Sequence, residues 1–582
     1  MNIILSTLNA KYIHSALALP YLKLCCENPS REIKILEFTI NQTLEEIRTR
    51  LFLSKPDILC FACYIWNIEP ILLLCRELQL LLSDCVIILG GPEVSFDAKQ
   101  VLAQNDSVRI IVRGEGEHTL REVLSSIERG DSQDGIKGIT YRDSNGKTIR
   151  ENPDRELIKH LDEIPSPYQG DLSPYQDRLV YYESSRGCPF NCSYCLSSTF
   201  QGVRTFSLDR VKSDLARLMD YGVATVKFVD RTFNANEKRA RAIMEFILEK
   251  NTRTRFHFEV CADLLSDDFM SFLLQVPHNL FAFEIGIQST FSPALQAVNR
   301  SCDMARFEEN VRKLATRGNI HLHLDLIAGL PWETYTDFRR SFNDVYRLQP
   351  QVIQLGFLKL MKGSTLRQAA REHGYVFQAH APYQVLSSKY MEHIDFIRLA
   401  QVETLLDRYY NSGEFQQGLT YIVEHIYDNA PFAFFADMAR FYEENAWFLQ
   451  GHKRSDEYNM LISLVENRFP GEENVVKEYL RYDYILNNRH KPLPERLVSN
   501  SNYDCQAKLY QLLKDRIFIG RELPEWCHLS KYELSKRVQL AAFNLDPTRD
   551  NNQKTRATLI LFVYLPNQTK AIRTIFVENT IS

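Results

Sequence analysis

Short apolar runs alternate with amphipathic stretches over residues 1–130. The apolar runs have the length and the β-branched content of buried strands, and the stretches between them repeat apolar residues at helical spacing. The predicted strands are Ile3–Leu5, Ile33–Glu37, Ile58–Ala62, Val86–Leu89 and Ile110–Val112. The predicted helices are Leu17–Cys25, Leu44–Leu53, Ile71–Leu82 and Thr119–Ile127. This alternation predicts an α/β fold, a doubly wound Rossmann-like parallel sheet, whose ligands bind beyond the carboxyl ends of the strands.

A second strand–helix alternation runs from Val180 to about Leu360. Its predicted strands are Val180–Ser184, Thr225–Val229, His257–Cys261, Phe281–Ile287, His321–Ile327 and Val352–Phe357. Six such units predict a partial (β/α)6 barrel, in which chemistry gathers at the C-terminal strand ends. Beyond about residue 380 the pattern is mostly α-helical, and a β-like tail closes the chain. The clearest segments there are Val402–Tyr410, Phe434–Phe448, Arg556–Tyr564 and Ala571–Val577.

These patterns divide the chain into four parts. A chain of 582 residues is too long for one hydrophobic core. We expect a Rossmann-like domain at 1–135, a linker at 136–178, a barrel at 179–375 and a mostly helical C-terminal domain at 376–582. Within the linker, Gly138–Lys147 reads as a hairpin around an Asn-Gly turn, and Asp162–Pro167 is rich in proline.

Composition narrows the setting in which the protein works. Hydrophobic content of 45% and charged content of 24% are ordinary for a globular protein. The net charge of −4 gives no electrostatic reason to expect nucleic acid as a partner. Charged residues and Pro70 interrupt the apolar stretch Ile58–Leu82, so no membrane span is expected. Thirteen cysteines without a signal peptide predict a reducing, cytoplasmic location.

Three cysteines carry the strongest chemical signal. Cys188, Cys192 and Cys195 lie in Arg-Gly-Cys-Pro-Phe-Asn-Cys-Ser-Tyr-Cys, directly after a predicted strand. Three thiolates on one loop can hold three irons of a [4Fe–4S] cluster and leave the fourth iron open. The open iron suits a ligand with an amine and a carboxylate, such as S-adenosylmethionine (SAM). Zinc or buried free thiols are the alternatives, but zinc needs a close fourth ligand, and the next residues of suitable type are His257 and Cys261.

The cysteine spacing, Tyr194 before the third cysteine and the preceding strand resemble the radical SAM superfamily. The resemblance implies that the three cysteines are the metal-binding and catalytic residues, and that SAM is cleaved to methionine and a 5′-deoxyadenosyl radical. It also implies that Tyr194 offers its backbone carbonyl to adenine.

Polar residues lie at the predicted ends of the later barrel strands, where SAM needs partners for its ammonium, ribose and adenine. They are Asp230, Arg231, Asn234, Glu259, Glu284, Gln288, Ser289, Asp325 and Gly329. By resemblance, Glu284 with Gln288-Ser289 matches the Glu-x-Gly-x-(Glu/Gln)-Ser strand of the superfamily. Gly329-Leu-Pro-x-Glu-Thr matches the turn that supports the adenosyl group. Singly, each residue could instead be a cap or a structural ion pair, and an Asp230–Arg231 pair is one such alternative.

Two loops follow the fourth and fifth strands of the first domain. They contain Gly90, Gly91, Pro92 and Glu93, and then Gly114 and Glu115. Glycines let a backbone approach a bulky ligand closely, although tight turns alone would also use them. The combined pattern resembles the cobalamin-binding domain that precedes many radical SAM domains.

His14 departs from one version of that domain. The cobalamin domains that ligate cobalt with histidine carry Asp-x-His-x-x-Gly, and His14 has neither the Asp nor the Gly. We therefore predict that His14 is not a cobalt ligand, as in radical SAM relatives that bind cobalamin without a protein histidine.

Together these resemblances imply a cobalamin-dependent radical SAM enzyme. The implied reaction is methyl transfer to an unactivated carbon or phosphorus of an unknown small-molecule or peptide substrate, with a reductant such as flavodoxin or ferredoxin. Cyclisation or rearrangement without methyl transfer, methylthiotransfer, and a cobalamin-binding sensor with a vestigial barrel stay open. Methylthiotransfer is disfavoured because the candidates for a second cluster, Cys25, Cys60, Cys63 and Cys85, fall within or beside predicted helices and strands, where buried cysteine is common.

Overall fold

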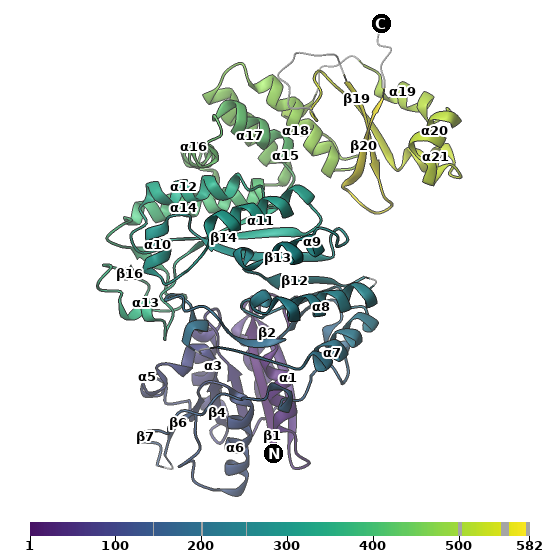
Figure 1. Ribbon diagram of the computed structural model, residues 1–582. Coiled ribbons are helices and arrows are strands. Elements are labelled where there is room, and N and C mark those ends of the chain that lie inside the picture. The colour runs from purple at the N-terminus through teal and green to yellow at the C-terminus, as the bar shows by residue number, and fades with distance from the viewer. Residues whose placement is uncertain (144, 200–201, 252, 499–502, 549–557, 578–582) are drawn as a thin grey trace. The chain divides into compact units, whose positions relative to one another are not determined.

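The N-terminal sheet of the computed structural model has the strand order β2-β1-β3-β4-β5-β6-β7 (Figure 1). The structure describes residues 1–582 except 144, 200–201, 252, 499–502, 549–557 and 578–582. The first five strands pair in parallel. They are β1 (Asn2–Asn9), β2 (Glu32–Thr39), β3 (Ile58–Ala62), β4 (Val86–Gly90) and β5 (Ile110–Val112). The strand order reverses between β1 and β3, and ligands of doubly wound sheets bind at such a switch point.

The hairpin predicted within the linker extends this sheet. Strands β6 (Ile139–Arg142) and β7 (Ile149–Glu151) run antiparallel beyond β5. Residues 139–151 therefore belong to the sheet edge instead of forming a free connector.

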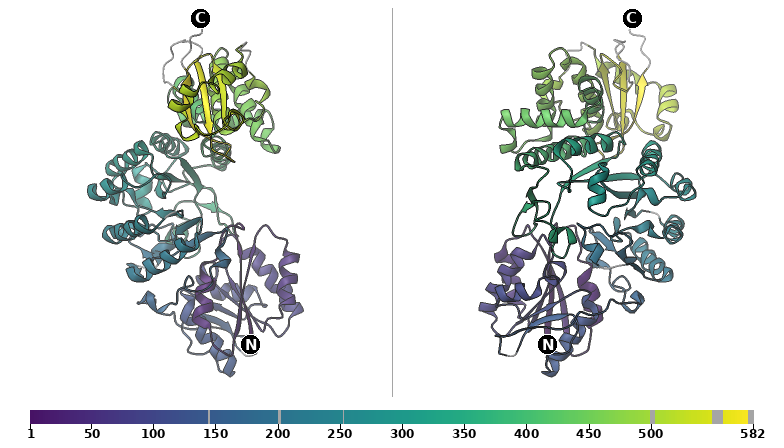
Figure 2. Two further views of the ribbon diagram at one scale, coloured as in Figure 1. Left: turned by 90° about the vertical axis from the view of Figure 1, so that its right-hand side faces the viewer. Right: turned by 60° about the vertical axis from the view of Figure 1, so that its left-hand side comes forward.

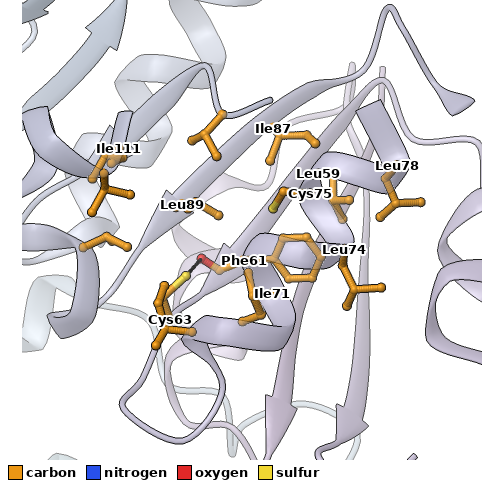
Figure 3. Packing of buried hydrophobic residues seen from close by; sticks show 14 of the residues in the cluster. Leu59, Phe61, Cys63, Ile71, Leu74, Cys75, Leu78, Ile87, Leu89 and Ile111 are labelled. Carbon is orange, nitrogen blue, oxygen red and sulfur yellow. Dashed lines mark hydrogen bonds between the residues drawn. The ribbon is translucent and has the colours of Figure 1, made fainter. Parts of the chain in front are cut away.

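Helices cover both faces of the sheet, each over its own hydrophobic core. Helices α1 (Ala18–Cys26) and α6 (Gly116–Arg129) pack on one face; α2 (Leu44–Leu53), α3 (Ile68–Leu81) and α5 (Ala98–Gln104) pack on the other. Figure 3 shows the second core, where Phe61 and Leu89 of the sheet meet Ile71 and Leu74 of α3. Cys63 is a buried member of this core, and its thiol lies 3.8 Å from the backbone carbonyl of Phe61. Neither α5 nor the short α4 (Pro92–Ser95) is predicted by the hydrophobic pattern.

The second sheet has the order β8-β11-β12-β13-β14-β15, with β8 to β14 paired in parallel. Its strands are β8 (Leu179–Tyr182), β11 (Thr225–Phe228), β12 (Arg255–Glu259), β13 (Phe281–Gln288), β14 (His321–Ala328) and β15 (Val352–Phe357). The intervening helices are α7 (Leu208–Tyr221), α8 (Glu237–Lys250), α9 (Asp267–Leu273), α10 (Ser292–Ala297), α11 (Met304–Arg317) and α12 (Tyr335–Tyr346). Side-chain caps define several helix starts, for example Ser207 on α7 and Thr334 on α12. The predicted six-stranded partial barrel is confirmed.

A compact unit comprises Met1–Pro350 with Gln354–Phe396, and a second comprises Gln351–Ile353 with Ile397–Ser582. The second unit is mostly helical, as predicted. Its helices include α15 (Gln416–Tyr421), α16 (Pro431–Glu444), α17 (Arg454–Arg468), α18 (Glu473–Asn487), α19 (Cys505–Leu512), α20 (Arg516–Glu522) and α21 (Lys531–Ser535). The predicted segment Val402–Tyr410 is formed by the end of α14 (His393–Leu405) and a π-helical turn, Leu406–Tyr410.

The second unit also contains an antiparallel sheet, drawn in yellow in Figure 2. Strands β19 (Thr558–Tyr564) and β20 (Ala571–Val577) match the predicted tail, while β18 (Val538–Phe543) was not predicted. Residues 556–557 of the predicted first strand lie outside the described part of the chain. Across the described residues, no helix combines the length and the apolar content needed to cross a bilayer.

Candidate functional site

The three motif cysteines lie on a loop held by a tight β-hairpin. Strand β9 (Ser185–Cys188) pairs antiparallel with β10 (Gly202–Thr205). Gly187 has φ +96°, and a Cβ on it would lie 2.0 Å from the carbonyl oxygen of Gly202. Only glycine fits there, because any larger residue would meet backbone. The hairpin therefore fixes Cys188 at the start of the loop.

Each thiol has a hydrogen-bonding neighbour. The Thr232 hydroxyl lies 3.6 Å from Cys188 Sγ, the Ser197 amide donates to Cys195 Sγ at 3.4 Å, and Arg300 Nη1 donates to Cys192 Sγ at 3.7 Å. Burial raises the pKa of the Cys192 thiol, and the Arg300 charge opposes that rise.

These donors fit an iron–sulfur cluster, whose properties depend on hydrogen bonds to its sulfurs. Among the described residues, no three His, Cys, Asp or Glu side chains converge as they would on one metal ion. An iron–sulfur cluster does not require the three thiolates to converge on one point, because each thiolate binds a different iron.

Arg186, next to the motif, is the centre of a buried ion-pair cluster. Its guanidinium contacts Glu183 at 3.0 Å, Glu115 at 3.1 Å and Glu117 at 2.6 Å. Arg204 on β10 adds a 2.8 Å contact to Glu115. Burial raises the pKa of Glu183 to about 7, although Arg186 opposes the shift. The cluster ties the loop before α6 to the cysteine hairpin, so these arginines already hold the Glu115 carboxylate that was predicted to face a cofactor.

A cavity of about 900 Å³ joins the strand ends of the N-terminal sheet to the barrel. Five residues predicted to bind cobalamin line it: Gly90, Gly91, Pro92, Gly114 and Glu115. From the barrel side it is lined by Tyr181, Lys227, Arg231 and Glu259. From the cysteine hairpin and loop, Gly187 and Leu196 also reach it. The volume is at the upper end of the range for ligand sites.

The cavity wall is apolar and close to backbone on the N-terminal side. Tyr64 and Trp66 line it and stack with ring centroids 4.6 Å apart. Gly114 has open space where a Cβ would be, whereas a Cβ on Gly91 would lie 2.5 Å from the Cys63 carbonyl. Gly91 is thus required by the turn itself, and Gly114 leaves the backbone accessible. Aromatic faces and exposed backbone fit a large planar cofactor. His14 also lines the cavity, with its pKa lowered by burial.

Glu93 does not face this cavity. Its carboxylate is buried and accepts a hydrogen bond of 2.8 Å from the Tyr383 hydroxyl. Burial raises its pKa, while Tyr383 and Lys362 oppose the rise.

Polar side chains occupy the barrel interior at alternating strand positions. Glu284 contacts Lys227 at 2.7 Å and His257 at 3.0 Å. Burial alone would raise the pKa of Glu284, but His257 and Lys227 together lower it. His323 and Asp325 lie 3.2 Å apart. Lys227 and His257 were not predicted as site residues, although their period-two spacing within apolar strands was the available signal.

Glu259 has a different environment from Glu284. It lines the cavity near Arg231, and burial raises its pKa to about 7.

Several predicted SAM-binding residues contact other parts of the protein. Ser289 is fully buried and donates a hydrogen bond to Glu333 of the Gly-Leu-Pro-x-Glu-Thr turn. Asp230 accepts hydrogen bonds from Ser184 and Ser185, and it makes no described ion pair with Arg231.

The remaining predicted residues are placed as follows. The Asn234 side chain donates a hydrogen bond to the backbone carbonyl of Cys261 and accepts one from its backbone amide. Gln288 adopts φ +72° at the end of β13 and is buried, and Gly329 at φ +95° accepts from the Tyr375 hydroxyl. Tyr194 is half-buried, and burial raises the pKa of its hydroxyl while the charge of Arg300 opposes the rise. The structure thus brings the glycine loops, Arg231 and Glu259 together in one cavity and places Glu284 and Asp325 in the barrel interior. The other predicted residues lie in the surrounding framework.

Comparison with protein families assigns each part of the chain. Residues 4–124 match the B12 binding domain, residues 182–345 match the radical SAM superfamily, and residues 371–562 match a domain described only as a protein of unknown function, DUF4080. These matches confirm the predicted domain types, and they support cobalamin, SAM and a [4Fe–4S] cluster as the cofactors.

Curated relatives resemble parts of the chain. An uncharacterized methyltransferase of Pyrococcus horikoshii is 37% identical over 170 residues, covering 27% of this chain and 36% of the relative. The hopanoid C-3 methylase of Methylococcus capsulatus is 25% identical, covering 52% and 58%. An anaerobic magnesium-protoporphyrin IX monomethyl ester cyclase of Rubrivivax gelatinosus is also 25% identical, covering 51% and 55%. The chain therefore spans about a third to somewhat over half of the length of these relatives.

Solved structures share the fold. The cobalamin-dependent SAM radical enzyme OxsB with bound aqua-cobalamin aligns with a TM-score of 0.55 at 15% identity, covering 90% of this chain and 80% of that one. The radical SAM methyltransferase TsrM of Kitasatospora setae aligns with a TM-score of 0.53 at 18% identity, covering 65% and 77%. At these identities the likeness concerns the fold.

Proposed function

We propose that this chain, which carries a B12-binding domain and a radical SAM domain, transfers a methyl group to an unactivated carbon or phosphorus of its substrate. The single observation that carries the proposal is the shared cavity. It is bordered by Gly90-Gly91 and Gly114 on one side and by Glu259 and the cysteine hairpin on the other. A methyl donor and a radical source must reach the same substrate atom, and one cavity open to both domains allows this.

Residue roles follow from the contacts. Cys188, Cys192 and Cys195 would hold the cluster, with Arg300 and Thr232 supplying donors to the sulfurs. When bound, the cofactors would supply the 5′-deoxyadenosyl radical and the methyl group, which the protein itself cannot provide.

The barrel residues would orient SAM. We assign Glu284, Gln288, Asp325 and the Tyr194 backbone to SAM, and the glycine loops to cobalamin. Lys227 and His257 keep Glu284 ionised, because both stabilise the carboxylate. His14 is not assigned to cobalt.

A cyclisation or rearrangement is the second candidate, favoured by the similarity to the cyclase of Rubrivivax gelatinosus. We further propose a cytoplasmic location, a reductant such as flavodoxin or ferredoxin, and a small-molecule or peptide substrate.

The test is anaerobic reconstitution with iron, sulfide and cobalamin, followed by incubation with SAM, reductant and cell extract. Methyl transfer predicts 5′-deoxyadenosine, S-adenosylhomocysteine and a product one methyl group heavier. 5′-Deoxyadenosine without a methylated product would favour cyclisation. No 5′-deoxyadenosine would favour a cobalamin-binding sensor.

Iron content provides the matched control. Replacing Cys188, Cys192 and Cys195 together with Ala should reduce iron from about four per chain to near zero. Cys527→Ala, at an exposed cysteine outside the motif, should leave iron unchanged. Retention of iron in the triple variant would refute the cluster assignment.

A further inference from the structure

The segment after the last barrel strand contacts three of the loops that are predicted to hold cofactors. This bridging segment comprises residues 358–391 and belongs to the first unit. It folds back on itself through two backbone hydrogen bonds, Leu360 N to Tyr383 O at 3.0 Å and Val385 N to Leu358 O at 2.9 Å. It contains α13 (Thr365–Gln368), β16 (Val376–Phe377) and β17 (Val385–Ser387).

Its first contact is with the glycine loop after β4. The buried Tyr383 hydroxyl donates to Glu93 at 2.8 Å. Lys362 donates to the Glu93 carbonyl at 3.2 Å and pairs with Asp97 at 2.9 Å. Gly363, at φ +83°, packs so closely on Phe96 that a Cβ would lie 2.4 Å from the ring. These contacts hold the segment that directly follows the cavity-lining Gly90 and Gly91.

The second contact is with the cysteine loop. The Leu366 amide donates to the Ser193 carbonyl at 2.9 Å, and the Thr365 hydroxyl donates to the same oxygen at 3.2 Å. Ser193 lies between Cys192 and Tyr194, so this carbonyl anchors the middle of the motif.

The third contact is with the turn after β14. The Tyr375 hydroxyl donates to the Gly329 carbonyl at 2.9 Å in a buried environment. The ring of Tyr390 lies 5.2 Å from that of Trp332 on the same turn. The resemblance assigns this turn to the adenosyl group of SAM.

We infer that the bridging segment is a positioning element that holds the cobalamin loop, the cysteine motif and the SAM turn in mutual register, with Tyr383 and Tyr375 as its positioning residues. The inference rests on the proposed function for the identity of the ligands. The DUF4080 match begins at residue 371, so both tyrosines lie in the region for which no function is described. The first residues of that region therefore form part of the proposed cofactor site.

The two tyrosines donate hydrogen bonds to different loops, so replacing each one should weaken the binding of a different ligand. Tyr383→Phe removes the donor to Glu93 and should weaken cobalamin binding roughly three- to ten-fold, with little change for SAM. Tyr375→Phe removes the donor to Gly329 and should weaken SAM binding by a similar factor, with little change for cobalamin. Tyr458→Phe is the matched control, because Tyr458 donates to the Glu414 carbonyl at 2.8 Å within the second unit; it should change neither affinity.

The experiment uses the full-length reconstituted protein. Cobalamin affinity is measured by anaerobic absorbance titration, SAM affinity by equilibrium dialysis, iron content by a colorimetric assay and thermal stability by calorimetry. A merely structural role would lower stability in all three variants without separating the two ligands.

The inference is supported if Tyr383→Phe weakens only cobalamin binding, Tyr375→Phe weakens only SAM binding, and the iron content of both variants is unchanged. If the wild type binds both ligands and neither variant alters its own ligand's affinity, the inference is overturned while the proposed function stands. If the wild type binds neither, the proposed function fails first.

Discussion

Glu333 connects the two motifs that were predicted to bind SAM. Its carboxyl is fully buried and accepts hydrogen bonds from Ser289 and Ser341. Burial raises its pKa to about 8, and the two hydroxyls oppose the shift. At neutral pH the group is therefore mostly protonated. Ser289 and Glu333 were both matched to SAM-binding motifs, yet the contact between them joins the ends of two barrel strands.

This pKa predicts a pH dependence of stability. The unfolded carboxyl releases its proton near pH 4.5, whereas the folded one retains it to about pH 8. Between these values the folded state binds more protons, so its stability falls as pH rises. Glu333→Gln cannot ionise and should gain stability relative to wild type, on the order of 1–3 kcal/mol, between pH 5 and pH 8. Urea unfolding at several pH values measures the difference, and a constant difference across this range would contradict the assignment.

Contacts of this kind separate the parts of the site that could be predicted from the sequence from those that could not. Strand ends could be located from apolar runs, so Glu284 and Gly329 could be placed near the barrel mouth. The hydrogen bond between Tyr383 and Glu93 joins residues 290 positions apart. Such a long-range pair cannot be predicted from the hydrophobic pattern of either segment. Lys227 and His257 differ, because alternation within their own strands places both on the inner face of the barrel.

The β9–β10 hairpin supports the cysteine loop through one close backbone approach. Gly187 and Gly202 both have positive φ, at +96° and +81°. A Cβ on Gly187 would meet the Gly202 carbonyl, whereas a Cβ on Gly202 would meet nothing within 4 Å. The two glycines therefore form a matched pair.

Gly187→Ala should open the hairpin and lower iron content after reconstitution by more than half, because Cys188 would lose its position. Gly202→Ala should cost about 1–2 kcal/mol of stability through left-handed backbone strain and retain the iron. Colorimetric iron analysis and thermal unfolding test both variants. Equal iron content in the two variants would show that the hairpin does not position Cys188.

Elements with strong apolar runs were predicted well, and weak ones were not. All strands of the parallel sheets were located from their apolar residues. Strands β3 and β5 are buried throughout, whereas barrel strands such as β11 and β12 bury every second residue. Strand β18 was missed, since its sequence VQLAAF contains two alanines, which have low strand propensity, and follows a helical region. The partners of the β6–β7 hairpin could not be inferred, because an Asn-Gly turn predicts a hairpin without predicting what the hairpin joins.

The molecule as a whole consists of two units with separate hydrophobic cores. The second unit has its own core around α19, α20 and its antiparallel sheet. Every residue that lines the cavity belongs to the first unit. Ligands that bind there can stabilise the second unit only if the two unfold together.

Calorimetry should therefore resolve two transitions that respond differently to ligands. Cobalamin at a hundred times its Kd should stabilise the first unit by about 2.7 kcal/mol and raise the Tm of one transition. The other transition should stay in place. A single transition, or an equal shift of both, would show that the units unfold cooperatively.

The position of Tyr375 and Tyr383 has a consequence for protein engineering. Both lie in the family region of unknown function, which begins at residue 371, although their hydrogen-bond partners lie at Glu93 and Gly329. A chimaera joined at the family boundary would combine tyrosines from one parent with acceptor loops from the other. A crossover at residue 397, where the second unit resumes, keeps donors and acceptors from the same parent. The start of the family match at residue 371 and the boundary suited to recombination at residue 397 are therefore different places in this chain.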